Sequence, residues 1–103
     1  MKIRQNSFTV KIEGLIWLDE IVEKLGRKHR VEAYEVEELF GGNPKFRFVE
    51  RGNREGEDVC SALGRTEGGR YLIVFFIWKV DDRAIPISAR NMTPGERKQY
   101  ARK

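Results

Sequence analysis

The sequence predicts an α+β fold, in which an antiparallel β-sheet is joined by two N-terminal helices and one C-terminal helix. Three observations support this prediction. Apolar residues repeat at helical spacing between residues 17 and 40. Short runs rich in aromatic and β-branched residues, separated by turn sequences, follow between residues 46 and 88. A Thr-Pro-Gly-Glu sequence at residues 93–96 is typical of the start of a helix.

The N-terminal half is expected to form one strand and two helices. Residues 8–12 alternate apolar and polar side chains, as a half-buried strand does. Residues 17–25 have helical spacing, and Gly26 is expected to end this first helix. A second helix is expected over residues 31–40, ending at the Gly-Gly-Asn-Pro sequence that follows. Both helices are expected on one face of the sheet.

The C-terminal half is expected to form four strands and the last helix. The strands are predicted at residues 46–48, 59–64, 71–78 and 84–88. The run at 71–78 is apolar throughout, which predicts the central strand, covered on both faces. Pro86 lacks a backbone donor, so it indicates that the last strand lies at an edge of the sheet.

The length of 103 residues predicts a single domain over residues 1–103. Cys60 is the only cysteine, which excludes an internal disulfide and a cysteine-based metal site. The N-terminal residues contain no apolar signal segment, and the apolar run at residues 72–78 is far shorter than the ~20 residues of a membrane span. We therefore expect a soluble, cytoplasmic protein without membrane contact.

The net charge of +4 permits an anionic partner without identifying one. The surplus is concentrated in residues 71–103, which contain seven basic and three acidic residues. The sequence contains neither a glycine-rich phosphate loop nor a cluster of His, Cys and carboxylate residues at metal-ligand spacing. We expect no cofactor and no metal ion.

Four arginines that flank the predicted strands are the first candidates for a functional site. The guanidinium group donates two parallel hydrogen bonds and stays charged, which suits a phosphate. Neighbouring strands lie ~4.8 Å apart, so arginines at strand ends could converge on one phosphate. The alternative is that each is a solvated arginine paired with a surface carboxylate. The four residues are Arg65, Arg70, Arg83 and Arg90.

Further candidates can transfer protons or stack on a base. His29, beside Lys28, can give or take a proton near neutral pH, or can simply cap a helix end. Glu57 could act as a general base, or only as a charge partner of the arginines. Tyr100 could stack on a nucleobase or pack its ring against the sheet.

The order of several short motifs resembles the BrnT family, small toxins of bacterial type II toxin–antitoxin systems. The resemblance covers residues 17–100, and its most specific part is the C-terminal pair of motifs. The motifs are Leu-Gly-Arg-Lys-His at 25–29, Gly-Arg-Thr at 64–66, Gly-Arg-Tyr-Leu-Ile-Val at 69–74, Ile-Ser-Ala-Arg at 87–90 and Glu-Arg-x-x-Tyr at 96–100.

This resemblance implies a RelE-like fold and a ribonuclease activity that arrests translation. It also implies neutralisation by a BrnA-type antitoxin, through which any contact with DNA would be indirect. RNA cleavage without a metal uses the 2′-hydroxyl as nucleophile, and the enzyme must align the attack and stabilise charge. The expected catalytic residues are Arg65 and Arg83 at the phosphate, Glu57 as base, and His29 or Lys28 as acid or further positive charge. The expected substrate-binding residues are Arg70, Arg90 and Tyr100.

Two other functions fit the same residues. A basic domain of this kind can bind RNA, DNA or a protein without any chemistry, because no residue pair is an unmistakable catalytic dyad. The chain could also be an inactive relic of a toxin that still binds its antitoxin. RNA cleavage products separate the first function from these two.

Overall fold

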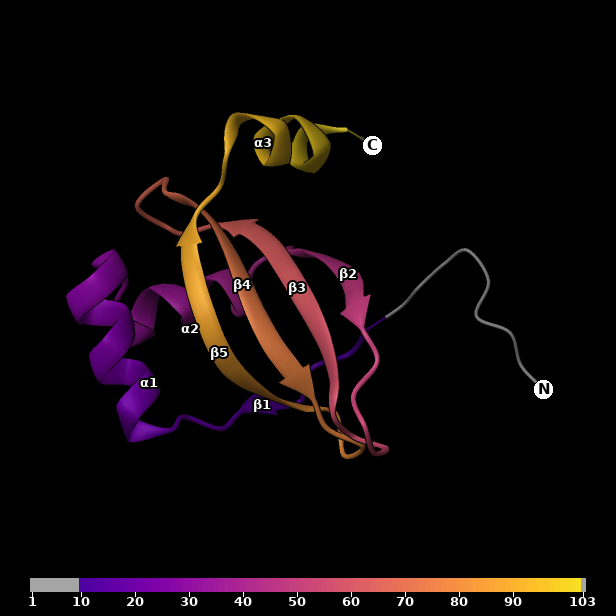
Figure 1. The fold of residues 1–103 in the computed structure, drawn as a ribbon. Coiled ribbons are helices and arrows are strands. Elements are labelled where there is room, and N and C mark those ends of the chain that lie inside the picture. Colours follow the sequence, from indigo (N-terminus) through magenta and orange to yellow (C-terminus); the bar gives the residue numbers. More distant parts are fainter. Residues whose placement is uncertain (1–9, 103) are drawn as a thin grey trace.

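Figure 1 shows the computed structural model of the protein, which describes residues 10–102. Its five-stranded sheet has the strand order β1-β5-β4-β3-β2. Helices α1 and α2 cover one face, and α3 lies beyond one end of the sheet (Figure 1). The elements are β1 (Gly14–Leu15), α1 (Asp19–Lys24), the π-helix η1 (Leu25–His29), α2 (Ala33–Gly41), β2 (Lys45–Glu50), β3 (Asp58–Arg65), β4 (Tyr71–Trp78), β5 (Arg83–Asn91) and α3 (Pro94–Ala101).

Strands β2, β3, β4 and β5 pair antiparallel in that order, which confirms the predicted antiparallel sheet, whereas β1 pairs parallel with β5. The predicted central position of β4 is confirmed, since it is the third of the five strands. The expected cover on both faces is only partial, because Phe75 and Ile77 are half-buried. Both β3 and β5 run opposite to β4. The C-terminal end of β3 therefore lies at the same end of the sheet as the C-terminal end of β5, where β4 begins.

Two clusters of buried side chains hold the fold together. Alternate residues of β4, such as Phe76, point to the face covered by the helices and pack with residues of η1 and α2, such as Leu25 and Leu39. On the opposite face, Leu63, Ile73 and Met92 form a smaller cluster, against which Tyr71, Phe75 and Tyr100 pack. Among the described residues, the second face is thus covered only near α3, where the ring of Tyr100 reaches the sheet.

Two predictions about the N-terminal half are wrong. Residues 10–12 are not part of a strand, and the strand instead forms at Gly14–Leu15; residues 8 and 9 lie outside the described residues. The first helix does not end at Gly26 but continues through the π-helical turn to His29. It ends at Arg30, whose N–H donates to the Leu25 carbonyl in a left-handed backbone conformation.

The other elements lie close to their predicted positions. Pro86 does not mark an edge strand, because β5 lies between β1 and β4. However, β1 pairs only with the first two residues of β5, so Pro86 lies beyond that pairing. The Thr93 hydroxyl accepts a hydrogen bond from the Glu96 N–H, which confirms the predicted start of α3. No helix in the described part of the chain is long and apolar enough to cross a membrane.

Candidate functional site

Two arginines and two tyrosines meet where α3 approaches the sheet. The Arg97 guanidinium carbon lies 3.9 Å from the centre of the Tyr71 ring, and that of Arg65 lies 5.5 Å from it. The rings of Tyr71 and Tyr100 meet edge to face, with 6.0 Å between their centres. We call these four residues, Arg65, Tyr71, Arg97 and Tyr100, the arginine–tyrosine cluster. It brings two positive charges to one aromatic surface.

The local sequence explains how this cluster forms. Arg65 ends β3 and Tyr71 begins β4, and the two residues are directly paired across the strands. Arg97 and Tyr100 are three residues apart in α3, so they lie on the same side of the helix. The Met92 N–H donates to the Tyr71 carbonyl at 3.0 Å, which fixes the end of β5 beside the start of β4. This hydrogen bond places α3, which begins two residues after Met92, beside the Tyr71 ring.

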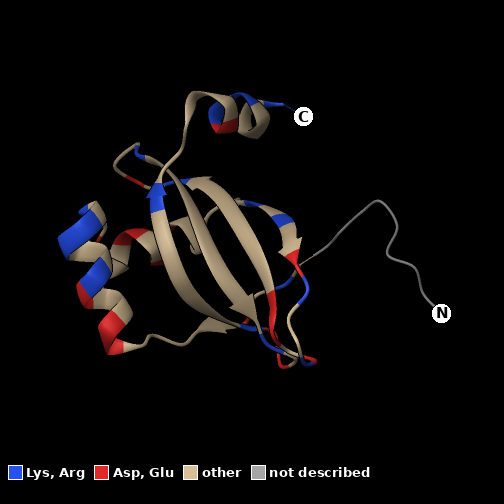
Figure 2. Cartoon of the chain, viewed as in Figure 1, with Lys and Arg blue, Asp and Glu red and all other residues tan. Residues whose placement is uncertain are grey.

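A groove of about 450 Å³ runs beside the cluster, with an aromatic wall and a basic rim. The ammonium group of Lys45 lies 5.6 Å from the centre of the Tyr100 ring and adds a positive charge from β2. Figure 2 shows lysines and arginines on α3 and at the neighbouring strand ends. Guanidinium groups suit phosphates and aromatic rings suit bases. The groove is lined by Tyr71, Pro94, Arg97, Lys98, Tyr100 and Ala101.

Arg90 and Glu96 fix α3 to the end of β5. Two guanidinium nitrogens of Arg90 donate to the two carboxylate oxygens of Glu96, at 2.8 and 3.0 Å. The same carboxylate accepts a hydrogen bond from the Thr93 N–H at 2.9 Å. None of the residues in α3 is buried, so this ion pair and the Tyr100 ring provide much of its attachment. The guanidinium group of Arg90, an expected substrate-binding residue, is therefore already bound to the Glu96 carboxylate.

The Arg90–Glu96 pair predicts a loss of stability in acid. The hydrogen bond from Arg90 lowers the pKa of Glu96 below its ordinary value of 4.5. A carboxylate whose pKa is lowered in the folded state stabilises the fold at pH values above its pKa in the unfolded chain. This stabilisation is lost as the pH falls through the pKa of the folded state. Urea unfolding should therefore show a larger acid destabilisation below pH 4.5 for the wild type than for Glu96→Gln. An equal pH dependence would contradict this role of Glu96.

Arg70, another expected substrate-binding residue, holds together three parts of the chain. It donates to the backbone carbonyls of Arg30 and His29 at 2.8 and 3.2 Å. It also donates to the side chains of Glu35 and Asn91, each at 2.9 Å. The structure thus uses Arg70 to connect the end of η1 with α2 and β5.

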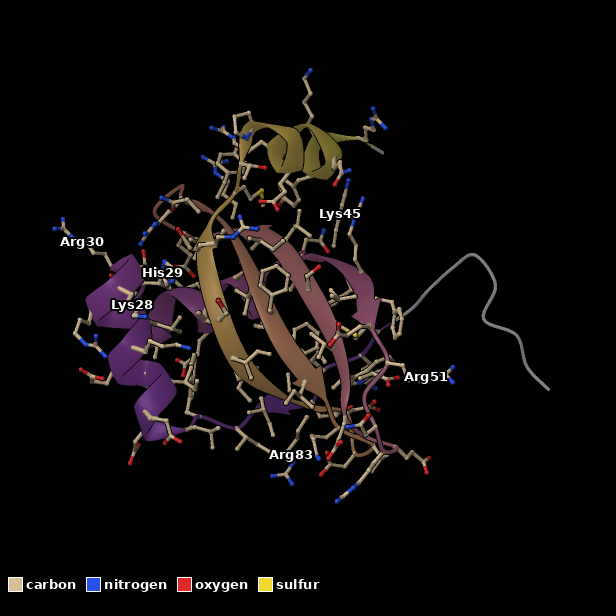
Figure 3. The ribbon with its side chains drawn as sticks, viewed as in Figure 1. Lys28, His29, Arg30, Lys45, Arg51 and Arg83 are labelled. Carbon is tan, nitrogen blue, oxygen red and sulfur yellow. The ribbon has the colours of Figure 1, made fainter. Side chains whose placement is uncertain are left out.

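Lys28 and His29 lie at the exposed end of η1 (Figure 3), and the His29 carbonyl accepts a hydrogen bond from Arg70. This is the same end of the sheet as the arginine–tyrosine cluster. The β3–β4 hairpin connects η1 with the arginine–tyrosine cluster. Its Gly69 lies against the guanidinium group of Arg65, since a Cβ atom built on Gly69 would be 3.4 Å from one of the guanidinium nitrogens. Arg70 is the next residue in that hairpin.

Arg83 and Glu57 lie at the opposite end of the sheet, so the expected convergence of Arg65 and Arg83 on one phosphate is not found. Arg65 pairs with Tyr71 at the start of β4, whereas Arg83 precedes Ala84, which pairs with Trp78 at its end. Seven steps of ~3.3 Å along β4 separate those ends by about 23 Å. Arg83 instead forms an ion pair with Asp81 at 2.9 Å. Glu57 immediately precedes β3, at the same far end.

Arg97 and Tyr71 belong to the arginine–tyrosine cluster, although the sequence-based prediction did not name them as candidates. Tyr71 begins the apolar run from which a strand covered on both faces is predicted, yet its ring contacts the guanidinium groups of Arg65 and Arg97. The spacing of Arg97 and Tyr100 in a basic helix is the signal that could have identified Arg97. Cys60 is a poor nucleophile candidate, because burial raises the pKa of its thiol to about 11. Within residues 10–102, no three His, Cys, Asp or Glu side chains are grouped as metal ligands.

Residues 17–96 match the family model described as "Ribonuclease toxin, BrnT, of type II toxin-antitoxin system". The chain belongs to the BrnT family. The match runs from the segment before α1 to the first turn of α3 and includes Arg65 and Tyr71, while Arg97 and Tyr100 follow directly after it. BrnT family membership indicates a ribonuclease toxin with an RNA substrate and an antitoxin partner. No curated protein matches the chain.

Proposed function

We propose that this BrnT-family protein cleaves RNA without a metal ion and that the arginine–tyrosine cluster binds the scissile phosphate. The observation that supports this site is the placement of two guanidinium groups, from Arg65 and Arg97, at the ring of Tyr71. Two positive charges beside an aromatic ring match the two components of a nucleotide, its phosphate and its base.

The proposed reaction is attack by a ribose 2′-oxygen on the adjacent phosphorus. The new bond closes a 2′,3′-cyclic phosphate, and the bond from phosphorus to the 5′-oxygen of the next nucleotide breaks. A base removes the proton of the 2′-hydroxyl, and an acid supplies a proton to the departing 5′-oxygen. The enzyme has to align these atoms and stabilise the charge that develops on the phosphoryl oxygens.

The residues at this end of the sheet are proposed to stabilise charge, contact the RNA and supply a proton. Arg65 and Arg97 stabilise the phosphoryl oxygens, and the ring of Tyr100 contacts a nucleobase of the RNA. His29 or Lys28, at the same end of the sheet, supplies a proton or further positive charge. Arg83 and Glu57 are too far along β4 to act on the same phosphate, so we place the reaction at the α3 end.

We propose that this activity inhibits translation by cutting RNA in the cytoplasm and that a BrnA-type antitoxin neutralises it. Any contact with DNA would then be made through that antitoxin. We also propose that the sheet with its flanking helices corresponds to a RelE-like fold. The proposed partner would have to cover the basic groove beside α3, for which an acidic or apolar segment that orders on binding is suited.

The proposal is tested by incubating the purified protein with end-labelled RNA in the presence of EDTA and mapping the cut ends. Discrete cuts that leave 2′,3′-cyclic phosphates are expected. Intact RNA combined with salt-sensitive RNA binding would contradict the proposal and indicate a binding module. Intact RNA without RNA affinity, but with tight antitoxin binding, would indicate an inactive relic.

A further inference from the structure

The end of the first helical segment departs from regular α-helical geometry twice within a few residues. Leu25–His29 forms a π-helix, a widened turn that is frequent at functional sites. Arg30 follows with φ 54° and ψ 40°, in the left-handed region that favours glycine. The hydrogen bonds around this turn are fixed, because the N–H groups of Arg30 and Val31 both donate to the Leu25 carbonyl.

An arginine is a costly choice for this turn. Leu25 and Val31 are both fully buried, so the chain cannot relax Arg30 without moving core residues. The left-handed conformation is unfavourable for a residue with a Cβ atom, whereas glycine adopts it freely. Positive charge at a helix C-terminus is favourable, but Arg27 and Lys28 already provide it within the helix. The strain at Arg30 therefore points to a use for its side chain.

The side chains at this turn form an exposed cationic group. Lys28, His29 and Arg30 are all exposed, and Figure 3 shows Arg30 extending away from the molecule. Within the described residues, none of the three side chains is in an ion pair, whereas Arg27 pairs with Glu23 at 2.9 Å. We call Lys28, His29 and Arg30 the η1 patch.

Arg70 connects the η1 patch to the proposed cleavage site. Its guanidinium donates to the carbonyls of His29 and Arg30, which fixes the backbone that carries the patch. Gly69, the residue before Arg70, lies against the guanidinium of Arg65. The patch and the arginine–tyrosine cluster are therefore held by the same hairpin, at the same end of the sheet.

We propose that Arg30, the last residue of the η1 patch, binds a backbone phosphate of the RNA away from the scissile phosphate, while Lys28 and His29 keep the role proposed above. This inference rests on the proposed function, since it gives the RNA a second point of attachment. The favoured ligand is a polyanion because the exposed group contains the positive charges of Lys28 and Arg30, with no carboxylate and no apolar side chain among its three residues. An acidic protein segment is the competing ligand, and the experiment below separates it from RNA.

The test compares wild type, Arg30→Gly and Arg30→Lys in binding a short single-stranded RNA whose 2′-hydroxyls are methylated, so that it cannot be cut. Arg30→Gly should lose one phosphate contact. The slope of log Kd against log salt concentration should then fall by ~0.7, and RNA binding should be about fivefold weaker at about 0.1 M salt. Arg30→Lys should keep the salt dependence. Removing the strain should also raise the Tm of Arg30→Gly, by about 4 °C.

The combination of a more stable protein and weaker RNA binding is the expected result. A raised Tm with unchanged RNA affinity would overturn the proposal, as would a lowered Tm for Arg30→Gly. Arg51→Gly removes an exposed arginine at the opposite edge of the sheet and should leave RNA affinity unchanged (Figure 3). An equal loss with this control would show that only total charge matters and would also overturn the proposal.

Failure of this inference can be distinguished from failure of the proposed function. Wild-type protein that neither cuts nor binds RNA contradicts the proposed function itself. If the wild type cuts RNA and Arg97→Ala does not, while Arg30→Gly binds RNA like the wild type, only the role of the η1 patch is wrong. Binding of an acidic peptide that depends on Arg30, without any effect on RNA, would assign the patch to a protein partner.

Discussion

Replacing Arg97 by alanine is expected to slow RNA cleavage by about 100-fold or more, because removal of one oriented donor typically costs about 2.7–4 kcal/mol of transition-state stabilisation. The Arg97 guanidinium lies 3.9 Å from the Tyr71 ring and shares that ring with Arg65. Arg97 is exposed on a helix that has no buried residue, so its removal should leave the fold intact.

Single-turnover cleavage of labelled RNA measures this effect, and thermal unfolding checks that the variant is folded. Arg97→Lys should retain part of the rate, since an ammonium keeps the charge but loses the planar fork. Arg51→Ala is the matched control, because it also removes an exposed arginine and should cleave at the wild-type rate. A wild-type rate for Arg97→Ala would remove Arg97 from the site.

Replacing Phe76 by alanine is expected to lower the free energy of unfolding by about 3–5 kcal/mol, the usual cost of removing a large aromatic side chain from a core. Phe76 is fully buried in the central strand β4. Its ring meets those of Phe40 and Phe46 edge to face, with centres 5.4 and 5.9 Å away. The substitution thus removes the ring of β4 from a three-phenylalanine cluster that also includes Phe40 of α2 and Phe46 of β2.

Urea unfolding monitored by circular dichroism measures this loss, with Phe48→Ala as the control. Phe48 is a phenylalanine of the edge strand β2 with 52% of its surface exposed. Its replacement should change the free energy of unfolding by less than about 0.5 kcal/mol, as surface substitutions usually do. Equal losses for the two variants would contradict the placement of Phe76 in the core.

The fold could be predicted from the sequence wherever local signals and burial agree. The apolar run at Tyr71–Trp78 coincides with β4, and Thr93 begins the last helix as its capping sequence indicates. The prediction failed at Gly26 because a glycine inside a helix can also be tolerated, and here the core contacts of Leu25 and Val31 extend the helix. The short strand β1 has no pattern of its own, since it exists only through its pairing with β5.

The site could be predicted only in part, because spacing along the chain does not give strand order. Arg65 and Tyr100 are both expected at the site from the sequence, and in the structure both contact the ring of Tyr71. Arg65 and Arg83 could be separated only once β3 and β5 were known to run in the same direction. Nor can the sequence distinguish Arg70, which holds the chain together through four hydrogen-bond acceptors, from an arginine that is free to bind RNA.

The central claim is that RNA is cleaved at the α3 end of the sheet, and a comparison of Arg65→Ala with Arg83→Ala tests it most directly. Both variants remove an exposed arginine, but the two residues lie at opposite ends of β4. In the same RNA cleavage assay, Arg65→Ala is expected to lose about 100-fold or more in rate. Arg83→Ala is expected to cleave like the wild type. Loss of cleavage in Arg83→Ala, with cleavage retained in Arg65→Ala, would contradict the account and place the site at the other end.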